Sequence, residues 1–275
     1  MMTKQYQLQD AEQWAAFSGD NNPIHFSLQA ARQLGLNALC IHGMRAMLDI
    51  KAALSAQAQS ALPQEQSLLF SCRLDKPVYY QRAYQFKNEQ MLLNHRRQAR
   101  STLWDEVNQE HCVQGKLAAV PAILPDISGE DGQISGEEMA ASFEALSAMT
   151  GQSLSLWNAL DALLFRRLIH SPNTMSRVRA VLPELNCPNL MEIFKHIQVV
   201  QTHHETHFSS SLLPTENTAL FDQPLNYSIL PALVAGKSKN GFILQVAIQA
   251  SSGKKALIRS SATLKTTFSD ANGNT

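Results

Sequence analysis

The sequence has little that would indicate a membrane, a nucleic acid or a strongly charged partner. It contains no run of 18 apolar residues, so we expect no membrane-spanning helix. Lys and Arg together number 23, as do Asp and Glu, and this balance gives no sign of a nucleic-acid partner. The first ten residues lack the apolar core of a signal peptide.

Cysteine is also scarce. The four cysteines are far apart and form no C-x-x-C pair: Cys40, Cys72, Cys112 and Cys187. They indicate reduced thiols in a cytoplasmic protein rather than a disulfide or zinc framework. No G-x-G-x-x-G, P-loop or G-x-S-x-G motif appears. We therefore predict no metal and no bound cofactor.

The first part of the chain reads as helices followed by strands. Short helices are expected at 11–17 and between Ser27 and Gly35, and a longer one from Gly43. Alternating or β-rich stretches follow at 67–74, 78–87, 91–103 and 111–120. This order predicts an α+β unit in which an antiparallel sheet wraps a long central helix.

The pattern then repeats, which indicates a duplicated unit in the 275 residues. A Pro-, Gly- and acid-rich stretch predicts a linker at 121–138, between an N-terminal unit at 1–120 and a C-terminal unit at 139–270. Helices are expected at 139–149 and 154–169, and strands between 193 and 268. The two units differ in the residues that could carry chemistry. Gln152 stands in the second unit where the first has Asp20, and the stretch 21–39 has no counterpart there.

Two short motifs carry the candidate chemistry, Ser18-Gly-Asp-Asn-Asn-Pro-Ile-His25 and Ile41-His-Gly-Met44. Asp20 and His25 stand five positions apart across a turn stiffened by Pro23, a spacing that suits two side chains converging on one water. Gly43 opens a helix, whose free N–H groups favour an anionic oxygen. Together these parts suit the addition or elimination of water next to a carbonyl.

The two motifs resemble the signature of the MaoC-like, (R)-specific enoyl-thioester hydratases and dehydratases. The resemblance covers about residues 10–120 and implies a hot-dog fold, so that the duplicated chain would be a double hot-dog. It implies that Asp20 and His25 are the acid–base pair, that Asn22 holds the loop, and that the Gly43 N–H binds the thioester oxygen. The implied substrates are trans-2-enoyl or 3-hydroxyacyl thioesters of coenzyme A or acyl carrier protein. The C-terminal unit would pair with the first in one sheet and form a wall of the acyl tunnel.

Two further residues belong to the expected substrate-binding set, His42 and Arg45. Arg45 stands where the family usually has a small or apolar residue; it either pairs with Asp49 one turn on or meets a polar group of the substrate. The stretch His203-His-Glu-Thr-His207 reads as a polar strand face, with a metal site as the minor alternative. The basic stretch 95–100 reads as a solvated strand face, or else attracts the phosphates of coenzyme A or an acidic carrier.

The sequence leaves two other functions open beside a hydro-lyase. One is a hot-dog thioesterase, in which water attacks the carbonyl carbon instead of C3. The other is an acyl-binding subunit without turnover, which the unusual Arg45 favours slightly. The expected partner is the acyl-thioester substrate, carried by coenzyme A or acyl carrier protein. A homodimer is one assembly that the sequence leaves open.

Overall fold

The computed structural model describes residues 3–61, 67–93, 96–121, 129–183, 187–196, 198–215, 218–236 and 241–267. Its α-helices are α1 (Leu8–Ser18), α2 (Leu28–Gln33), α3 (Gly43–Ala61), α4 (Gly136–Thr150), α5 (Leu156–His170), α6 (Pro172–Arg179) and α7 (Leu190–His196). Short 3-10 helices are η1 (Pro23–His25), η2 (Ser210–Leu212) and η3 (Thr218–Asp222). None of the helices in these ranges is both long and apolar enough to cross a membrane.

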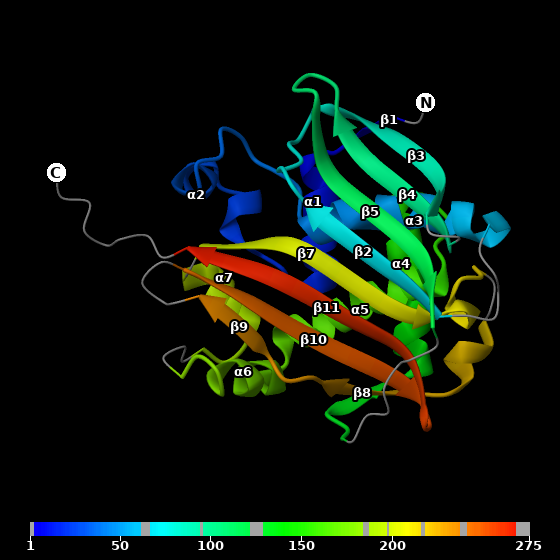
Figure 1. The fold of residues 1–275 in the computed structure, drawn as a ribbon. Helices are drawn as coiled ribbons and strands as arrows, with labels where there is room; N and C mark the ends of the chain where they lie inside the picture. Colours follow the sequence, from blue (N-terminus) through cyan, green and yellow to red (C-terminus); the bar gives the residue numbers. More distant parts are fainter. Residues whose placement is uncertain are drawn as a thin grey trace.

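One antiparallel sheet runs through the whole chain (Figure 1). Its strands are β1 (Thr3–Gln5), β2 (Ser67–Leu74), β3 (Ala83–Leu93), β4 (Arg96–Asp105), β5 (Glu110–Val120), β6 (Gly132–Ile134), β7 (Gln198–Ser209), β8 (Leu225–Ile229), β9 (Leu233–Gly236), β10 (Phe242–Ser252) and β11 (Lys255–Thr267). Their order is β1-β3-β4-β5-β2-β7-β11-β10-β8-β6, with β9 beside β10.

The two units are joined at the β2–β7 pair, where Ser67 lies opposite Ser209 and Arg73 opposite His203. From this seam the strand order reads outward in the same way on both sides, which confirms that the unit is duplicated. The turn after α1 and the turn after α4 also correspond, because Gly19 and Gly151 both end their helix in the left-handed conformation. The backbone was therefore kept in both units, although Asp20 became Gln152.

The central helices α3 and α5 lie on the same face of the sheet and pack against each other (Figure 1). Helix α3 contacts β4 and β5, and α5 contacts β10 and β11, so each unit wraps its own helix. Trp157 on α5 stacks on Phe208 and donates a hydrogen bond of 2.9 Å to Ser55 on α3. The fold is thus α+β and a double hot-dog, as predicted.

Several predicted boundaries were wrong. The strand expected at 78–87 begins only at Ala83, because Gln81 has a φ of 58° and makes a turn. The same strand was also ended too early. β3 continues to Leu93, and Asn88 and Glu89, which lie between the strands expected at 78–87 and 91–103, pair with Ser101 and Arg100.

In the second unit the linker and the first strand needed correction. The second half of the predicted linker at 121–138 forms β6 and the start of α4, whose N-terminus Ser135 caps by accepting from the Glu138 N–H at 3.1 Å. Residues 122–128 lie outside the described residues. The strand expected from 193 starts at Gln198, after α6 and α7, which the sequence reading missed.

Candidate active site

The turn that carries Asp20 is built by the end of α1. Gly19 has a φ of 76° and its N–H donates to the Ala15 carbonyl at 2.7 Å. A Cβ at this position would lie 2.3 Å from His170 Nε2, so both the backbone angle and the packing require glycine. The next N–H, that of Asp20, donates to Ser18 Oγ at 3.1 Å. The helix end therefore fixes the direction in which Asp20 leaves the turn.

The following residues form a closed local network. Asp20 Oδ1 accepts from the Asn22 N–H at 3.2 Å, and Asn22 Oδ1 caps η1 by accepting from the Ile24 N–H at 3.3 Å. Pro23 opens this single helical turn, where its missing N–H costs nothing. The turn delivers His25, 7% exposed, beside Asp20, 9% exposed.

Two imidazoles face the carboxylate. His25 Nδ1 donates to the Cys40 carbonyl at 2.9 Å, and His42 Nε2 donates to the Asp20 carbonyl at 2.9 Å, since a carbonyl oxygen can only accept. The free lone pairs are therefore on His25 Nε2 and His42 Nδ1. The rings stack with centroids 3.6 Å apart. One side-chain atom from each of Asp20, His25 and His42 lies within 4.8 Å of the other two, close enough for one water to bridge them.

Burial moves the two candidate acid–base groups in opposite directions. Desolvation raises the pKa of Asp20 from 3.8 to about 6, although the Asn22 N–H opposes this. Desolvation lowers the pKa of His25 from 6.5 to about 4, opposed by its bond to Cys40. The pKa of His42 is also lowered, by burial and by His25. At neutral pH the site thus holds an ionised carboxylate beside neutral imidazoles.

The N-terminus of α3 lies next to this cluster. Gly43 opens the helix directly after His42, and a Cβ on it would come within 2.5 Å of Leu74 Cδ2. The first N–H groups of a helix have no acceptor within it. Since Gly43 also lines the cavity, its helix end offers donors to an oxygen placed there.

These groups open into one cavity of about 360 Å³ that both units line. The N-terminal unit contributes Asp20, Asn22, His25, His42, Gly43 and Met44. The C-terminal unit contributes Phe165, Phe194, Val199, Val200, Gln201, Thr202, Leu264 and Lys265. The prediction that the second unit forms a wall of the site is confirmed.

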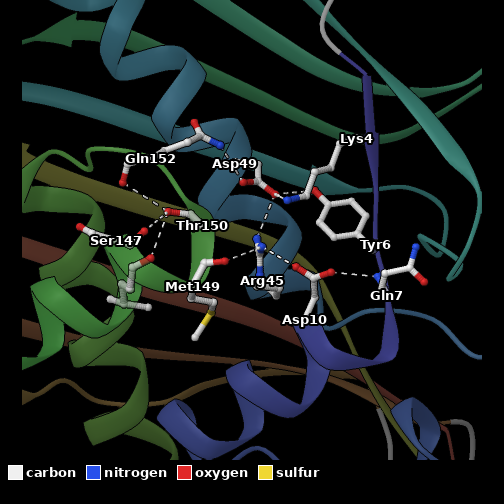
Figure 2. A network of polar contacts seen from close by, with 11 residues as sticks. Lys4, Tyr6, Gln7, Asp10, Arg45, Asp49, Ser147, Met149, Thr150 and Gln152 are labelled. Atoms are coloured by element: carbon white, nitrogen blue, oxygen red, sulfur yellow. Dashed lines mark hydrogen bonds and ion pairs between the residues drawn. The ribbon is translucent and has the colours of Figure 1, made fainter.

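Arg45 is the exception among the predicted site residues, and its assignment to substrate binding needs correction. It does not line the cavity, and its side chain is fully buried on another side of α3 (Figure 2). There Nη1 donates to Asp49 at 2.9 Å, while Nη2 donates to Asp10 at 2.7 Å and reaches the Met149 carbonyl at 3.4 Å. The pairing with Asp49 is confirmed, and Arg45 ties α1, α3 and the end of α4 together.

Arg45→Met should therefore weaken folding and spare activity. The substitution leaves the buried Asp49 without its guanidinium, and we expect a loss of about 2–4 kcal/mol in the free energy of unfolding. Urea denaturation measures this loss, and steady-state kinetics on an enoyl thioester should stay within about twofold of the wild type. A tenfold rise in KM at unchanged stability would return Arg45 to the substrate-binding residues.

The cluster of Asp20, His25 and His42 has the composition of a metal site, since one ligand atom of each residue lies within 4.8 Å of the other two. The absence of a metal remains a prediction.

The other candidates from the sequence lie away from the cavity. Within β7, His203 and Glu205 face outward, beside Arg73, Arg100 and Lys116, and none of these joins a metal-like cluster among the described residues. Of the basic stretch 95–100, His95 lies outside the described residues, and Arg100 belongs to this outer face.

Sequence reasoning missed a buried polar cluster between the two units, formed by Lys51, Asp161, His204 and Thr206. Asp161 accepts from the Lys51 ammonium, from His204 Nε2 at 2.9 Å and from Thr206 Oγ1 at 2.7 Å. These contacts hold the pKa of Asp161 below its ordinary value in spite of full burial. A signal existed, since Lys51 and Asp161 each interrupt the apolar run of a central helix.

The raised pKa of Asp20 has a consequence for stability that pH can reveal. Because the folded chain binds this proton more tightly than the unfolded chain, Asp20 costs stability as pH rises from about 4 to about 6. Asp20→Asn removes this cost, so we expect the variant to gain about 1–3 kcal/mol over the wild type at pH 7 and almost nothing at pH 3.5. Urea denaturation at both pH values tests it, and a variant less stable at pH 7 contradicts it.

The chain is thus a double hot-dog protein, and within its described residues a carboxylate and two imidazoles meet at the N-terminus of α3. The MaoC-like domain is the family whose model matches, over residues 2–103. The matched residues include both motifs on which the resemblance to this family rests. A search of curated proteins finds no match.

Of three solved structures similar to the chain, one has a name that states a double hot-dog fold. A MaoC-like dehydratase is 10% identical, with 97% of this chain and 96% of that one covered and a TM-score of 0.49. A conserved Mycobacterium tuberculosis protein described as a double hotdog is 9% identical, with coverages of 96% and 94% and a TM-score of 0.49. An acyl-CoA thioesterase II from Mycobacterium marinum is 10% identical, with coverages of 84% and 90% and a TM-score of 0.44.

Proposed function

We propose that the protein is a hydro-lyase that interconverts trans-2-enoyl and (3R)-3-hydroxyacyl thioesters. The observation that carries this proposal is the convergence of Asp20, His25 and His42 within 4.8 Å of one another, next to the N-terminus of α3. Burial separates two of their pKa values, raising that of Asp20 to about 6 and lowering that of His25 to about 4. Such a pair assigns distinct proton-transfer roles to neighbouring groups. The Gly43 helix end supplies the donor that an enolate oxygen needs.

In the hydration direction, the Asp20 carboxylate orients a water whose proton passes to His25 Nε2 as its oxygen bonds to C3. The electrons of the C2–C3 double bond move toward the thioester carbonyl, and its oxygen becomes enolate-like against the Gly43 N–H. The imidazolium formed is a strong acid because the pKa of His25 is low, so it returns a proton to C2. In total, one O–H bond of water and the C2–C3 π bond are broken, and a C3–O bond and a C2–H bond are formed. Dehydration is the reverse of these steps.

The surroundings of the site suit an acyl thioester. Apart from the acid–base cluster, the cavity has mostly apolar walls, among them Ile24, Ile41, Val78, Phe165 and Leu264. Lys265 is exposed where it lines the cavity, and so is Lys76, although Lys76 pairs with Glu110 at 3.0 Å. The apolar walls favour an acyl chain inside, and Lys265 favours an anionic carrier, coenzyme A or acyl carrier protein, outside. The proposal needs no metal or redox cofactor.

The test is a panel of trans-2-enoyl-CoA and enoyl-carrier substrates of varied chain length. Hydration is measured as the loss of absorbance of the conjugated enoyl thioester, and the release of free thiol is measured in parallel. Loss of absorbance without thiol release supports the proposal. Thiol release from a saturated acyl-CoA would make the protein a thioesterase, and binding without either signal would make it an acyl-binding subunit. With Arg45 outside the cavity, the observation that favoured such a subunit is gone.

A further inference from the structure

One side chain of the C-terminal unit places a carboxamide in the largely apolar wall of the cavity. This is Gln201 on β7, half-buried among Val199, Leu264 and Phe165. Its neighbour Thr202 also lines the cavity, but the hydroxyl of Thr202 is bound to the Thr263 carbonyl at 3.3 Å. Gln201 thus offers an amide in a wall that is otherwise apolar apart from Thr202 and the exposed Lys265.

A β-bulge turns this side chain inward. Gln201 lies opposite Leu264 and His203 opposite Thr263, so Thr202 is an extra residue in β7. Without it, the alternation of a strand would put Gln201 and His204 on opposite faces of the sheet. With it, both point to the interior, and Gln201 Nε2 lies 3.2 Å from His204 Nδ1. Bulges beside active sites commonly redirect a side chain in this way.

The buried cluster determines how the amide is oriented. The Asp161 carboxylate can only accept, so the His204 Nε2 that contacts it carries the proton. The atom of Gln201 that lies 3.2 Å from His204 Nδ1 is the amide nitrogen, which can only donate, so His204 Nδ1 accepts from it. One N–H of the amide is thereby fixed, which also fixes the direction of the other.

The second N–H of Gln201 has only a weak partner. Gln201 Nε2 lies 3.6 Å from the Met44 sulfur, and a thioether is a poor acceptor. Met44 directly follows Gly43 in the first turn of α3. A donor with spare capacity thus stands beside the helix end at which the thioester oxygen is proposed to lie, on the wall that the other unit provides.

We propose that Gln201 donates a second hydrogen bond, beside the Gly43 N–H, to the thioester oxygen of the substrate. This inference rests on the proposed function. The bond strengthens as electron density moves from the C2–C3 double bond onto that oxygen, so it acts mainly in the transition state. His204 is then a positioning residue, and the C-terminal unit contributes to the reaction although it has no acid–base motif.

The test compares Gln201→Met, Gln201→Glu and the wild type on a short trans-2-enoyl-CoA. Methionine keeps the length of the side chain and removes the donor, so we expect kcat to fall about 10²-fold with KM changed by no more than about threefold. Glutamate cannot donate and adds negative charge beside the forming enolate, so its kcat should fall at least as far. Gln245→Met is the matched control, because Gln245 on β10 does not line the cavity.

A fall in kcat in both folded variants, verified by thermal melting, supports the inference, and a methionine variant within twofold of the wild-type kcat, or with only KM raised, overturns it. Should the methionine variant fail to fold, the glutamate variant, also of equal length, is read by the same criteria. An inactive wild type refutes the proposed function and the inference with it, whereas an active wild type matched by Gln201→Met refutes the inference alone.

Discussion

Asp20→Asn should lower kcat for enoyl-thioester hydration by about 10³-fold, and His25→Ala should do the same. Asparagine keeps the shape of Asp20 and can still accept from the Asn22 N–H, but it carries no charge with which to orient the water. Alanine at position 25 removes Nε2, which takes the proton. Because both residues act on one water, the double variant should be within about tenfold of either single variant.

The measurement is steady-state hydration followed at the enoyl absorbance, with Asp222→Asn as the matched control. Asp222 is exposed in η3 and does not line the cavity, so the same chemical change there should leave kcat unaltered. Folding of the variants is checked by circular dichroism and thermal melting. Turnover within tenfold of the wild type in both site variants would remove Asp20 and His25 from the mechanism.

Lys51→Met should give the largest loss of stability among the substitutions considered, about 3–5 kcal/mol. Lys51 and Asp161 are both fully buried, and they pair between the two central helices. Removing the ammonium leaves the carboxylate in the core with His204 and Thr206 as its remaining donors. An uncompensated buried charge costs much more than an exposed pair contributes.

Urea denaturation measures this loss, and two further variants make the result specific. Lys51→Met combined with Asp161→Asn removes both charges, so it should recover at least half of the lost stability. Lys76→Met breaks the exposed Lys76–Glu110 pair on the surface, and the midpoint of unfolding should scarcely move. Equal midpoints for Lys51→Met and Lys76→Met would contradict the charged, buried pair.

The parts of the site that local sequence determines were predictable, and the parts that depend on tertiary packing were not. Gly19, Pro23 and Gly43 act through turn and helix-end geometry, which is encoded within a few residues. Gln201 could not be found, because its inward direction depends on an extra residue at Thr202 in the pairing with β11. Arg45 was assigned to the substrate because its second partner, Asp10, lies 35 positions away on α1.

The β2–β7 pair joins the two units in one sheet, but the units contribute different groups to the cavity. In a dimer of identical hot-dog chains, the same sequence would have to form both the acid–base turn and the wall that faces it. Fusion into one chain removes that compromise. Gln152, in the place of Asp20, donates to Asp49, the partner of Arg45, at 3.2 Å, and the bulge in β7 directs Gln201 into the cavity. The asymmetry between the units is a division of labour.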